Sequence, residues 1–308
     1  MRVYRLHIRP GAGKNSFEYC LKQKVLGVGW QVSVKRKEKL TWEQYEKAAS
    51  KASFGPKVNN SVRYLHDNVK PMDLIWTRDK KGKYYLAQVR STRGNSRTDS
   101  AWEYLDTPGG QEADIANVVR CRILPVPQVD DVTGKIVACF RPSRTIQSIS
   151  DETTVLYSQL LWNQLTGAEE YKLPHIEWWD IFSFLDAETT EDLIFIYLQC
   201  KGWIVVPHSR KADTMAYEFI AIHKKTQERA IVQVKSGHTH LATDIWGNFE
   251  EKVFLFQSHG HYTGVPTANV TQIAPKVIER FMTSEIEIMP NATRRWIDFV
   301  AKMNLAGA

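Results

Sequence analysis

The sequence predicts two domains: an N-terminal, mainly-β barrel with flanking helices, and a C-terminal α/β domain around a central mixed sheet. A chain of 308 residues, 43% of them hydrophobic, is long enough to bury two cores. Short β-branched and aromatic runs separated by turn residues fill the first half, which is typical of a small barrel. Helical and strand patterns follow each other in the second half, which is typical of a sheet covered by helices. We expect the domains at residues 1–150 and 186–308, joined by a helical linker at residues 151–185.

The first half contains three strand segments and one clear helix. The strands are VLGVGWQVSV, MDLIW and YYLAQV, and the residues KKGK supply a hairpin turn between the last two. The helix is TWEQYEKAASKA. Thr41 at its start and Gln44 three residues later have the spacing of a capping box, in which each side chain bonds the other residue's backbone N–H.

The second half begins with two helices. The first is ETTVLYSQLLWNQL in the linker. The second contains LIFIYL, with Thr189 as its N-cap, Asp192 as the box partner and Gly202 at its end. Because LIFIYL is apolar all round, this helix should be buried. Three strands follow at WIVVP, YEFIAIH and AIVQVK, and then a strand at KVFLFQ and a helix at PKVIERFM.

Charge is divided unevenly along the chain. Residues 1–150 hold 27 Lys and Arg against 14 Asp and Glu, a net charge of +13, whereas residues 151–308 hold 14 against 20, a net charge of −6. A basic excess of this size is expected of a surface that meets a polyanion, because Lys and Arg release the counterions condensed on phosphates. A solvated, solubilising surface is the alternative explanation.

Two compositional features bear on the compartment. No apolar run approaches the roughly 20 residues that span a bilayer, and MRVYRLHIRPGAGK lacks the apolar stretch of a signal peptide. We therefore expect a cytoplasmic protein with no membrane partner. The four cysteines lack C-x-x-C spacing, so we interpret them as reduced, mostly buried thiols: Cys20, Cys121, Cys139 and Cys200.

Polar side chains mark the strands that follow the LIFIYL helix. Gln233 and Lys235 face the same side of their strand, and a hairpin with the preceding strand would bring the Glu218 carboxylate beside them. Glu191 lies in the first turn of the helix. Carboxylates with a lysine suit metal-assisted phosphodiester hydrolysis, because oxygen ligands hold a divalent cation that polarises the phosphate and generates hydroxide. Each residue alone also has an ordinary structural explanation, such as a helix-dipole contact for Glu191.

The segment from Thr190 to Gly237 resembles the Mrr-like branch of the PD-(D/E)XK nuclease superfamily. The matching positions are Glu191, Gly202, Trp203, Glu218, Gln233 and Lys235. The resemblance implies a restriction-endonuclease-like fold that uses Mg²⁺ or Mn²⁺. It also implies catalytic roles for Glu191, Glu218, Gln233 and Lys235, with Glu218 and Gln233 as metal ligands.

The sequence departs from that superfamily at two positions. Glu218 stands where aspartate is usual, and Gln233 stands where glutamate is usual. A glutamine cannot be an anionic ligand, but its amide oxygen can coordinate a metal or position a water. Asp213 is an alternative acid, which we interpret as a residue that supports its loop.

Four of the nine histidines form two His-x-His pairs, His238 with His240 and His259 with His261, on either side of KVFLFQ. Four imidazoles are compatible with a zinc site. We favour the interpretation that they are exposed to solvent or contact phosphate.

Aromatic and arginine residues of the first half suggest a nucleobase-binding surface. Aromatic faces stack bases, and arginines hold phosphates. The candidates for stacking are Trp30, Trp76, Trp102 and Tyr104, and those for the DNA backbone are Arg90, Arg93 and Arg97. The alternative is that the aromatic residues form the core of the barrel, which is the usual place of Trp on a strand.

The first half also resembles an EVE-like domain of the PUA-like superfamily. The resemblance is carried by GVGWQV, NSVRY, MDLIWTRDKKGKYYLAQV, WEY, ADIANVVRC and GKIVACF. It implies a barrel that binds a modified base in an aromatic pocket between strands.

Together the two resemblances imply a type IV restriction endonuclease that defends the cell against foreign DNA. It would bind double-stranded DNA carrying 5-methylcytosine or 5-hydroxymethylcytosine, flip the base out of the duplex and cut nearby. One active site per nuclease domain predicts a homodimer for cutting both strands. Two alternatives stay open: a catalytically inactive protein that binds modified DNA or RNA, and an RNA-processing enzyme.

Overall fold

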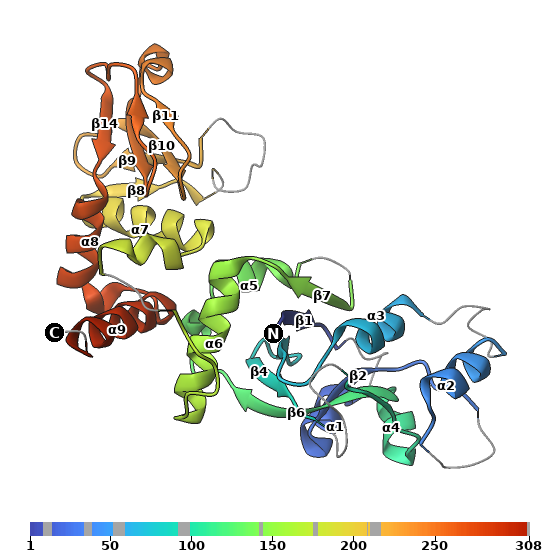
Figure 1. Ribbon diagram of the computed structural model, residues 1–308. Coiled ribbons are helices and arrows are strands. Elements are labelled where there is room, and N and C mark those ends of the chain that lie inside the picture. The colour runs from blue at the N-terminus through green and yellow to red at the C-terminus, as the bar shows by residue number, and fades with distance from the viewer. Residues whose placement is uncertain are drawn as a thin grey trace. The chain divides into compact units, whose positions relative to one another are not determined.

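The computed structural model divides the chain into two compact units (Figure 1). The first unit consists of Met1–Val132 and Ile136–Lys172, and the second of Thr133–Lys135 and Leu173–Ala308. The structure describes residues 1–8, 14–33, 39–51, 59–91, 99–141, 144–174, 178–207, 209 and 217–306. The division falls inside the segment expected to be a linker, because the helix of that segment packs into the first unit.

A seven-stranded mixed sheet forms the first unit. Its strands are β1 (Val3–Leu6), β2 (Val25–Val28), β3 (Leu74–Arg78), β4 (Tyr84–Val89), β5 (Trp102–Tyr104), β6 (Asn117–Pro125) and β7 (Ile146–Ile149). The order is β2-β6-β4-β3-β1-β7, with β5 also paired to β6. Only the β1–β3 pair is parallel among these pairings. Strand β6 pairs with β2 and β5 through its first half and with β4 through its second, which lets the sheet curl into an incomplete barrel.

Helices flank this sheet. They are α1 (Ser16–Gln23), α2 (Trp42–Ala49), α3 (Asn60–Asn68), α4 (Pro108–Ala113), α5 (Gly134–Cys139) and α6 (Glu152–Thr166), with a short 3-10 turn, η1 (Val129–Asp131). The capping box of α2 is confirmed: the Thr41 hydroxyl accepts from Gln44 N, and Thr41 N donates to the Gln44 amide oxygen.

The strand expected at VLGVGWQVSV is shorter than predicted. It ends at Val28, because Trp30 adopts a left-handed backbone conformation with φ 67° that no strand can continue through. The hairpin around KKGK is confirmed, with β3 and β4 paired antiparallel from Leu74 opposite Gln88 to Arg78 opposite Tyr84.

Helix α6 packs against the curled sheet through buried polar contacts. The indole N–H of Trp76 on β3 donates to Ser158 Oγ at 2.9 Å, and Tyr157 Oη donates to the Asp131 carbonyl at 2.6 Å. Trp76, Tyr157 and Ser158 are all fully or almost fully buried. These contacts explain why α6 belongs to the first unit.

A five-stranded sheet forms the second unit. Its strands are β8 (Trp203–Val205), β9 (Phe219–His223), β10 (Arg229–Lys235), β12 (Lys252–Gln257) and β14 (Val270–Ile273), in the order β14-β12-β10-β9-β8. The first three form an antiparallel meander, and β10, β12 and β14 are parallel. The expected order of helix and three strands is confirmed. Strand β14 and the small parallel pair β11 (Leu241–Ala242) and β13 (Tyr262–Thr263) were not predicted.

The helices of the second unit are η2 (Trp178–Phe184), α7 (Ala187–Cys200), η4 (Asp244–Asn248), α8 (Pro275–Ser284), η5 (Ile286–Ile288) and α9 (Asn291–Ala306). Helix α7 packs against β8 and β10. It begins earlier than predicted, because Asp186 caps it and accepts from Thr189 N at 2.6 Å; Thr189 is therefore not the N-cap. Gly202 follows the helix with φ 89°, as expected of a residue that ends one.

Two further expectations concern the cysteines and the membrane. Cys20 and Cys121 are buried, Cys139 is half-buried and Cys200 is exposed, and all four are free thiols. Burial raises the pKa of Cys20 to about 12, which keeps that thiol protonated and unreactive. None of the helices in the described part of the chain combines the length and apolarity needed to cross a bilayer.

We predict that Asp186→Ala lowers the free energy of unfolding by about 1 kcal/mol, the usual cost of losing an N-cap. Asp186→Asn should keep most of the stability, because asparagine is an equally good cap and burial already raises the pKa of the Asp186 carboxyl. Urea unfolding followed by circular dichroism measures both. Equal loss in the two variants would contradict the capping role.

Candidate functional site

Three polar side chains of the second unit converge at one end of the β9–β10 hairpin. Phe219 pairs with Val232, so Glu218, one residue before β9, lies opposite Gln233. The Glu218 Oε1 atom accepts from Gln233 Nε2 at 2.9 Å and from Lys235 Nζ at 3.2 Å. The strand alternation therefore predicted this convergence correctly.

The three side chains are graded from buried to exposed. Gln233 is 3% exposed, whereas the side chains of Glu218 and Lys235 are 27% and 41% exposed. An ion pair with that much solvent access adds on the order of 1 kcal/mol or less to stability. Stability alone therefore gives little reason for a lysine and a carboxylate to meet here, and their ends are open to a ligand.

Two buried amide oxygens lie on adjacent strands of this site. Among the described residues, neither Gln233 Oε1 nor Gln257 Oε1 has a hydrogen-bond partner. A buried acceptor without a partner costs about 1–3 kcal/mol, which a bound cation or water would relieve. Gln257 pairs with Lys235 in the parallel β10–β12 register, so it belongs to the same region. Sequence reasoning missed Gln257, although it is the polar residue that ends the apolar KVFLFQ strand.

The donor set fits a hard divalent cation. Mg²⁺ is commonly held by one or two carboxylates, with water and substrate phosphate completing its coordination. The Glu218 carboxylate could supply one protein ligand. Gln233 turns its amide nitrogen toward Glu218, so its buried amide oxygen could be a second ligand only with the amide group reversed. Within the described residues, no group of three or more His, Cys, Asp or Glu is arranged to hold a metal ion.

The two other predicted acids are placed differently. Glu191 lies in α7, near the start of the helix that packs against β10, and is half-buried. Asp213 lies outside the described residues.

The four histidines form two cross-strand pairs. The rings of His240 and His261 lie 3.6 Å apart between centroids, and those of His238 and His259 lie 5.4 Å apart. The parallel β11–β13 register explains this arrangement, since it places residue 240 beside 261 and residue 238 beside 259. Three of the imidazoles are exposed and His259 is half-buried.

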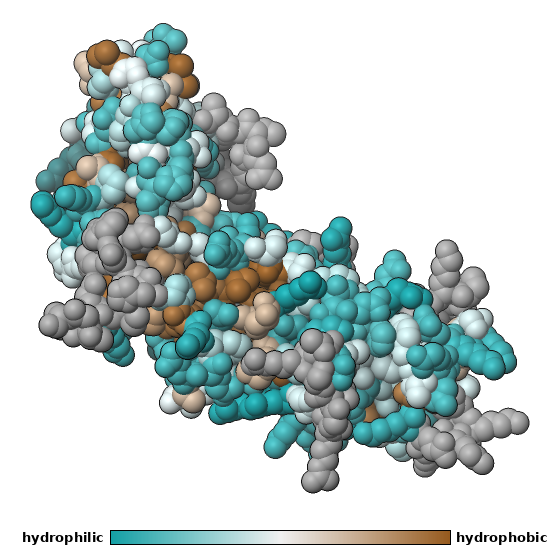
Figure 2. Space-filling model, viewed as in Figure 1, coloured by the Kyte–Doolittle hydropathy of each residue, from teal (hydrophilic) through white to brown (hydrophobic). Residues whose placement is uncertain are grey.

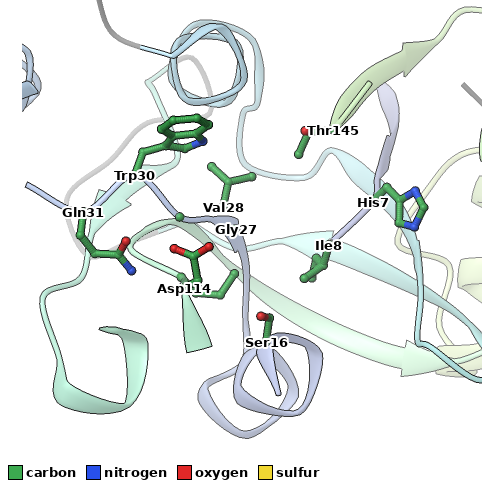
Figure 3. A pocket seen from close by; sticks show the side chains of 11 residues that line it. His7, Ile8, Ser16, Gly27, Val28, Trp30, Gln31, Asp114 and Thr145 are labelled. Atoms are coloured by element: carbon green, nitrogen blue, oxygen red, sulfur yellow. The ribbon is translucent and has the colours of Figure 1, made fainter. Parts of the chain in front are cut away.

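A pocket of about 370 Å³ opens in the first unit, where β2 ends and α4 is followed by β6 (Figure 3). This volume lies within the range of small-molecule sites, roughly 300–1,000 Å³. Apolar side chains, half-buried or buried polar side chains and glycine backbone share its walls. The lining residues are His7, Ile8, Ser16, Gly27, Val28, Gly29, Trp30, Gln31, Asp114, Ile115 and Thr145.

Trp30 gives this pocket an aromatic wall at the cost of backbone strain. The residue is 37% exposed, the only tryptophan among the exposed large hydrophobics of the described chain. A bulky residue with positive φ costs about 1–3 kcal/mol and persists only when its surroundings fix it. Here the Trp30 carbonyl accepts from Tyr45 Oη at 2.9 Å and from Asn117 Nδ2 at 3.3 Å. Burial raises the pKa of Tyr45 to about 12, which keeps its hydroxyl a donor.

The other aromatic residues proposed for stacking are buried in the core. Trp76 is fully buried against α6, and Trp102 donates to Asn117 Oδ1 at 3.1 Å. The Tyr104 hydroxyl lies within 3.0 Å of both backbone polar atoms of Val32. A base cannot stack on these faces in this arrangement, which corrects their assignment. Trp102 and Tyr104 instead help hold the segment that carries Trp30.

Of the three predicted phosphate-binding arginines, the structure describes Arg90. Arg90 is exposed, directly after β4, and its backbone N–H donates to the Arg120 carbonyl at 2.8 Å. Arg93 and Arg97 lie outside the described residues.

Comparisons with known proteins give little similarity. No protein-family model matches the chain, and no curated protein matches it. Among solved structures, the chain is similar to the DNA modification-dependent restriction endonuclease AspBHI, at a TM-score of 0.25 and 10% sequence identity, over 90% of this chain and 79% of that chain. A TM-score this low does not establish a shared fold, so the assignment of function depends on the side chains of this chain.

Proposed function

We propose that this protein is a modification-dependent DNA endonuclease whose second unit cuts and whose first unit binds a modified base. The convergence of Glu218, Gln233 and Lys235 at one end of a hairpin carries the proposal. The resemblance of this segment to Mrr-like nucleases gives the convergence its chemical interpretation. Mg²⁺ or Mn²⁺ is the proposed cofactor.

The residues of the site have distinct roles in this proposal. A bound divalent cation would supply charge neutralisation at the phosphate and a lowered pKa for a coordinated water. Glu218 would hold that ion as an anion, and Gln233 would add its amide oxygen with the amide group turned toward the ion. Lys235, half-exposed and fixed by Glu218, donates to the attacking water or to the phosphate oxygen that gains charge. Glu191 supports the same site from α7.

The first unit supplies the choice of substrate. The excess of 13 positive charges over residues 1–150 attracts DNA without regard to sequence. A separate binding unit then raises the local concentration of the nuclease near a marked base. We propose 5-methylcytosine or 5-hydroxymethylcytosine in double-stranded foreign DNA as the target, and a homodimer for cutting both strands.

One observation favours the alternative of an inactive binding protein. The converging cluster contains a single carboxylate, because Gln233 is neutral, so the protein contributes less negative charge to a cation than two acids would. In that case the second unit would keep the geometry without the chemistry, and the first unit would still bind modified DNA or RNA.

Lys235→Ala should lower the rate of cutting of a 5-hydroxymethylated plasmid by about 100-fold or more, because removing one preorganised donor to the reacting phosphate typically costs that much. The matched control is Lys225→Ala in the exposed turn between β9 and β10. Single-turnover cleavage in Mg²⁺, with EDTA as a blank, measures both. Unchanged cutting by the Lys235 variant would show that the site is wrong. If the wild-type protein cuts nothing, the alternative of an inactive binding protein is favoured.

Gln233→Glu should lower the Mg²⁺ concentration needed for half-maximal cutting several-fold, because a second anionic ligand replaces a neutral one. Gln272→Glu, at an exposed position of β14, adds the same charge away from the site and should change nothing. A Mg²⁺ titration of the cleavage rate compares the two variants. The same response in both would contradict direct coordination by residue 233.

A further inference from the structure

The pocket beside β2 combines an aromatic and aliphatic part with a carboxylate at one end. The Trp30 indole and the aliphatic side chains of Val28 and Ile8 all line it (Figure 3). An aromatic face with aliphatic side chains nearby suits a flat ring, because base–aromatic stacking requires only a π-face. Trp30 has a left-handed backbone just past the end of β2, and the residue is 37% exposed, not buried in the core.

A carboxylate lies at one end of the same pocket. Asp114 follows α4 in a left-handed conformation, and its Oδ1 atom lies so close to Gly29 that a Cβ there would approach it to 2.5 Å. Gly29 therefore leaves room for this carboxylate. Among the described residues, no side chain donates a hydrogen bond to it. The pocket thus presents an acceptor with unused capacity beside an aromatic wall.

The neighbouring polar groups fix this end of the pocket. Gln31 Nε2 donates to the Gly110 carbonyl at 3.3 Å, and the Ser16 hydroxyl donates to the Ala113 carbonyl. Both acceptors belong to α4, the helix that Asp114 ends. The carboxylate is therefore carried by a segment held on two sides, as a recognition group needs to be.

We propose that this pocket receives the flipped base, with Trp30 as the stacking face and Asp114 as the acceptor for an exocyclic amino group. An ionised carboxylate only accepts hydrogen bonds. Cytosine bases present an amino donor at C4, whereas thymine and uracil bases present a carbonyl oxygen there. A carbonyl facing Asp114 leaves two acceptors opposed, so among pyrimidines the pocket selects cytosine-class bases. This inference rests on the proposed function, since it names the atoms that read the base.

Paired probes isolate the group at C4. Duplexes carrying 5-hydroxymethylcytosine or 5-hydroxymethyluracil differ at C4 and share the same 5-substituent. 5-Methylcytosine and thymine form a second such pair, and a duplex with unmodified cytosine is the reference for the effect of the modification. Each base is placed opposite an abasic site, so that no pairing energy is lost on flipping. Fluorescence anisotropy with the full chain, in Ca²⁺ or EDTA so that cutting cannot intervene, measures the dissociation constants.

Asp114→Asn is the first variant. Asparagine tolerates the left-handed backbone, and its amide offers either a donor or an acceptor. We expect the preference for the cytosine member of each pair to fall at least about tenfold, chiefly through tighter binding of the uracil member. Glu112→Gln, on the exposed surface of α4, makes the same charge change two residues away and should leave the preference intact.

Trp30→Gly is the second variant. Glycine adopts positive φ without strain, which offsets part of the packing lost with the indole, and thermal unfolding checks that the variant stays folded. Binding of every flipped base should still weaken by at least about tenfold, because the stacking face is gone. A variant that is stable but cannot bind separates recognition from folding.

The outcomes distinguish the inference from the proposed function. If the wild-type protein binds modified and unmodified duplexes equally, the proposed function fails. If the wild-type protein prefers modified cytosine, but both variants equal the wild type in affinity and in C4 preference, this pocket does not bind the flipped base and the inference is overturned. Loss of C4 preference in Asp114→Asn alone, with Glu112→Gln unchanged, supports it.

Discussion

The pairing of β9 with β10 is the constraint on which the candidate active site depends. Antiparallel register places Glu218 directly opposite Gln233, and the two-residue period of the strand brings Lys235 to the same face. No long loop has to be ordered to assemble these groups. A slip of one residue would turn Gln233 and Lys235 to the opposite face of the sheet, so the same hydrogen bonds that build the sheet also define the site.

The features that depend on local sequence patterns are the part of the structure that the sequence predicted best. The hairpin around KKGK, the capping box of Thr41 and the convergence at Glu218 all follow from local patterns that pairing then enforces. Side chains brought together by distant segments were not predictable in this way. Gln257 lies beside Lys235 only because β12 pairs parallel to β10, and nothing local distinguishes it from any polar residue that ends a strand.

The prediction of base-stacking residues had a different limit, because amino-acid type alone does not show which aromatic side chains are buried. Composition identified Trp30, Trp76, Trp102 and Tyr104 equally, but only backbone conformation separates them. Trp76, Trp102 and Tyr104 lie on regular strands that face the core, whereas Trp30 lies just past a strand end with φ 67°. The glycines on either side of Val28 were the available signal. Gly27 and Gly29 sit where a Cβ would collide with residues of β6 and with Asp114.

The two candidate sites share one structural principle. Each lies where a rigid strand ends, so the sheet fixes its position while Lys235 in one site and Trp30 in the other stay accessible to solvent. In the second unit this place holds the buried Gln233 amide oxygen, which has no hydrogen-bond partner among the described residues, and in the first unit it holds the strained backbone of Trp30. Both features cost stability, and buried networks offset that cost: β-sheet pairing around Gln233, and the Tyr45 and Asn117 hydrogen bonds behind Trp30. A fold can keep such a cost where a bound ligand supplies the interactions that the protein alone does not make. The same two places therefore carry the proposed chemistry and the proposed recognition.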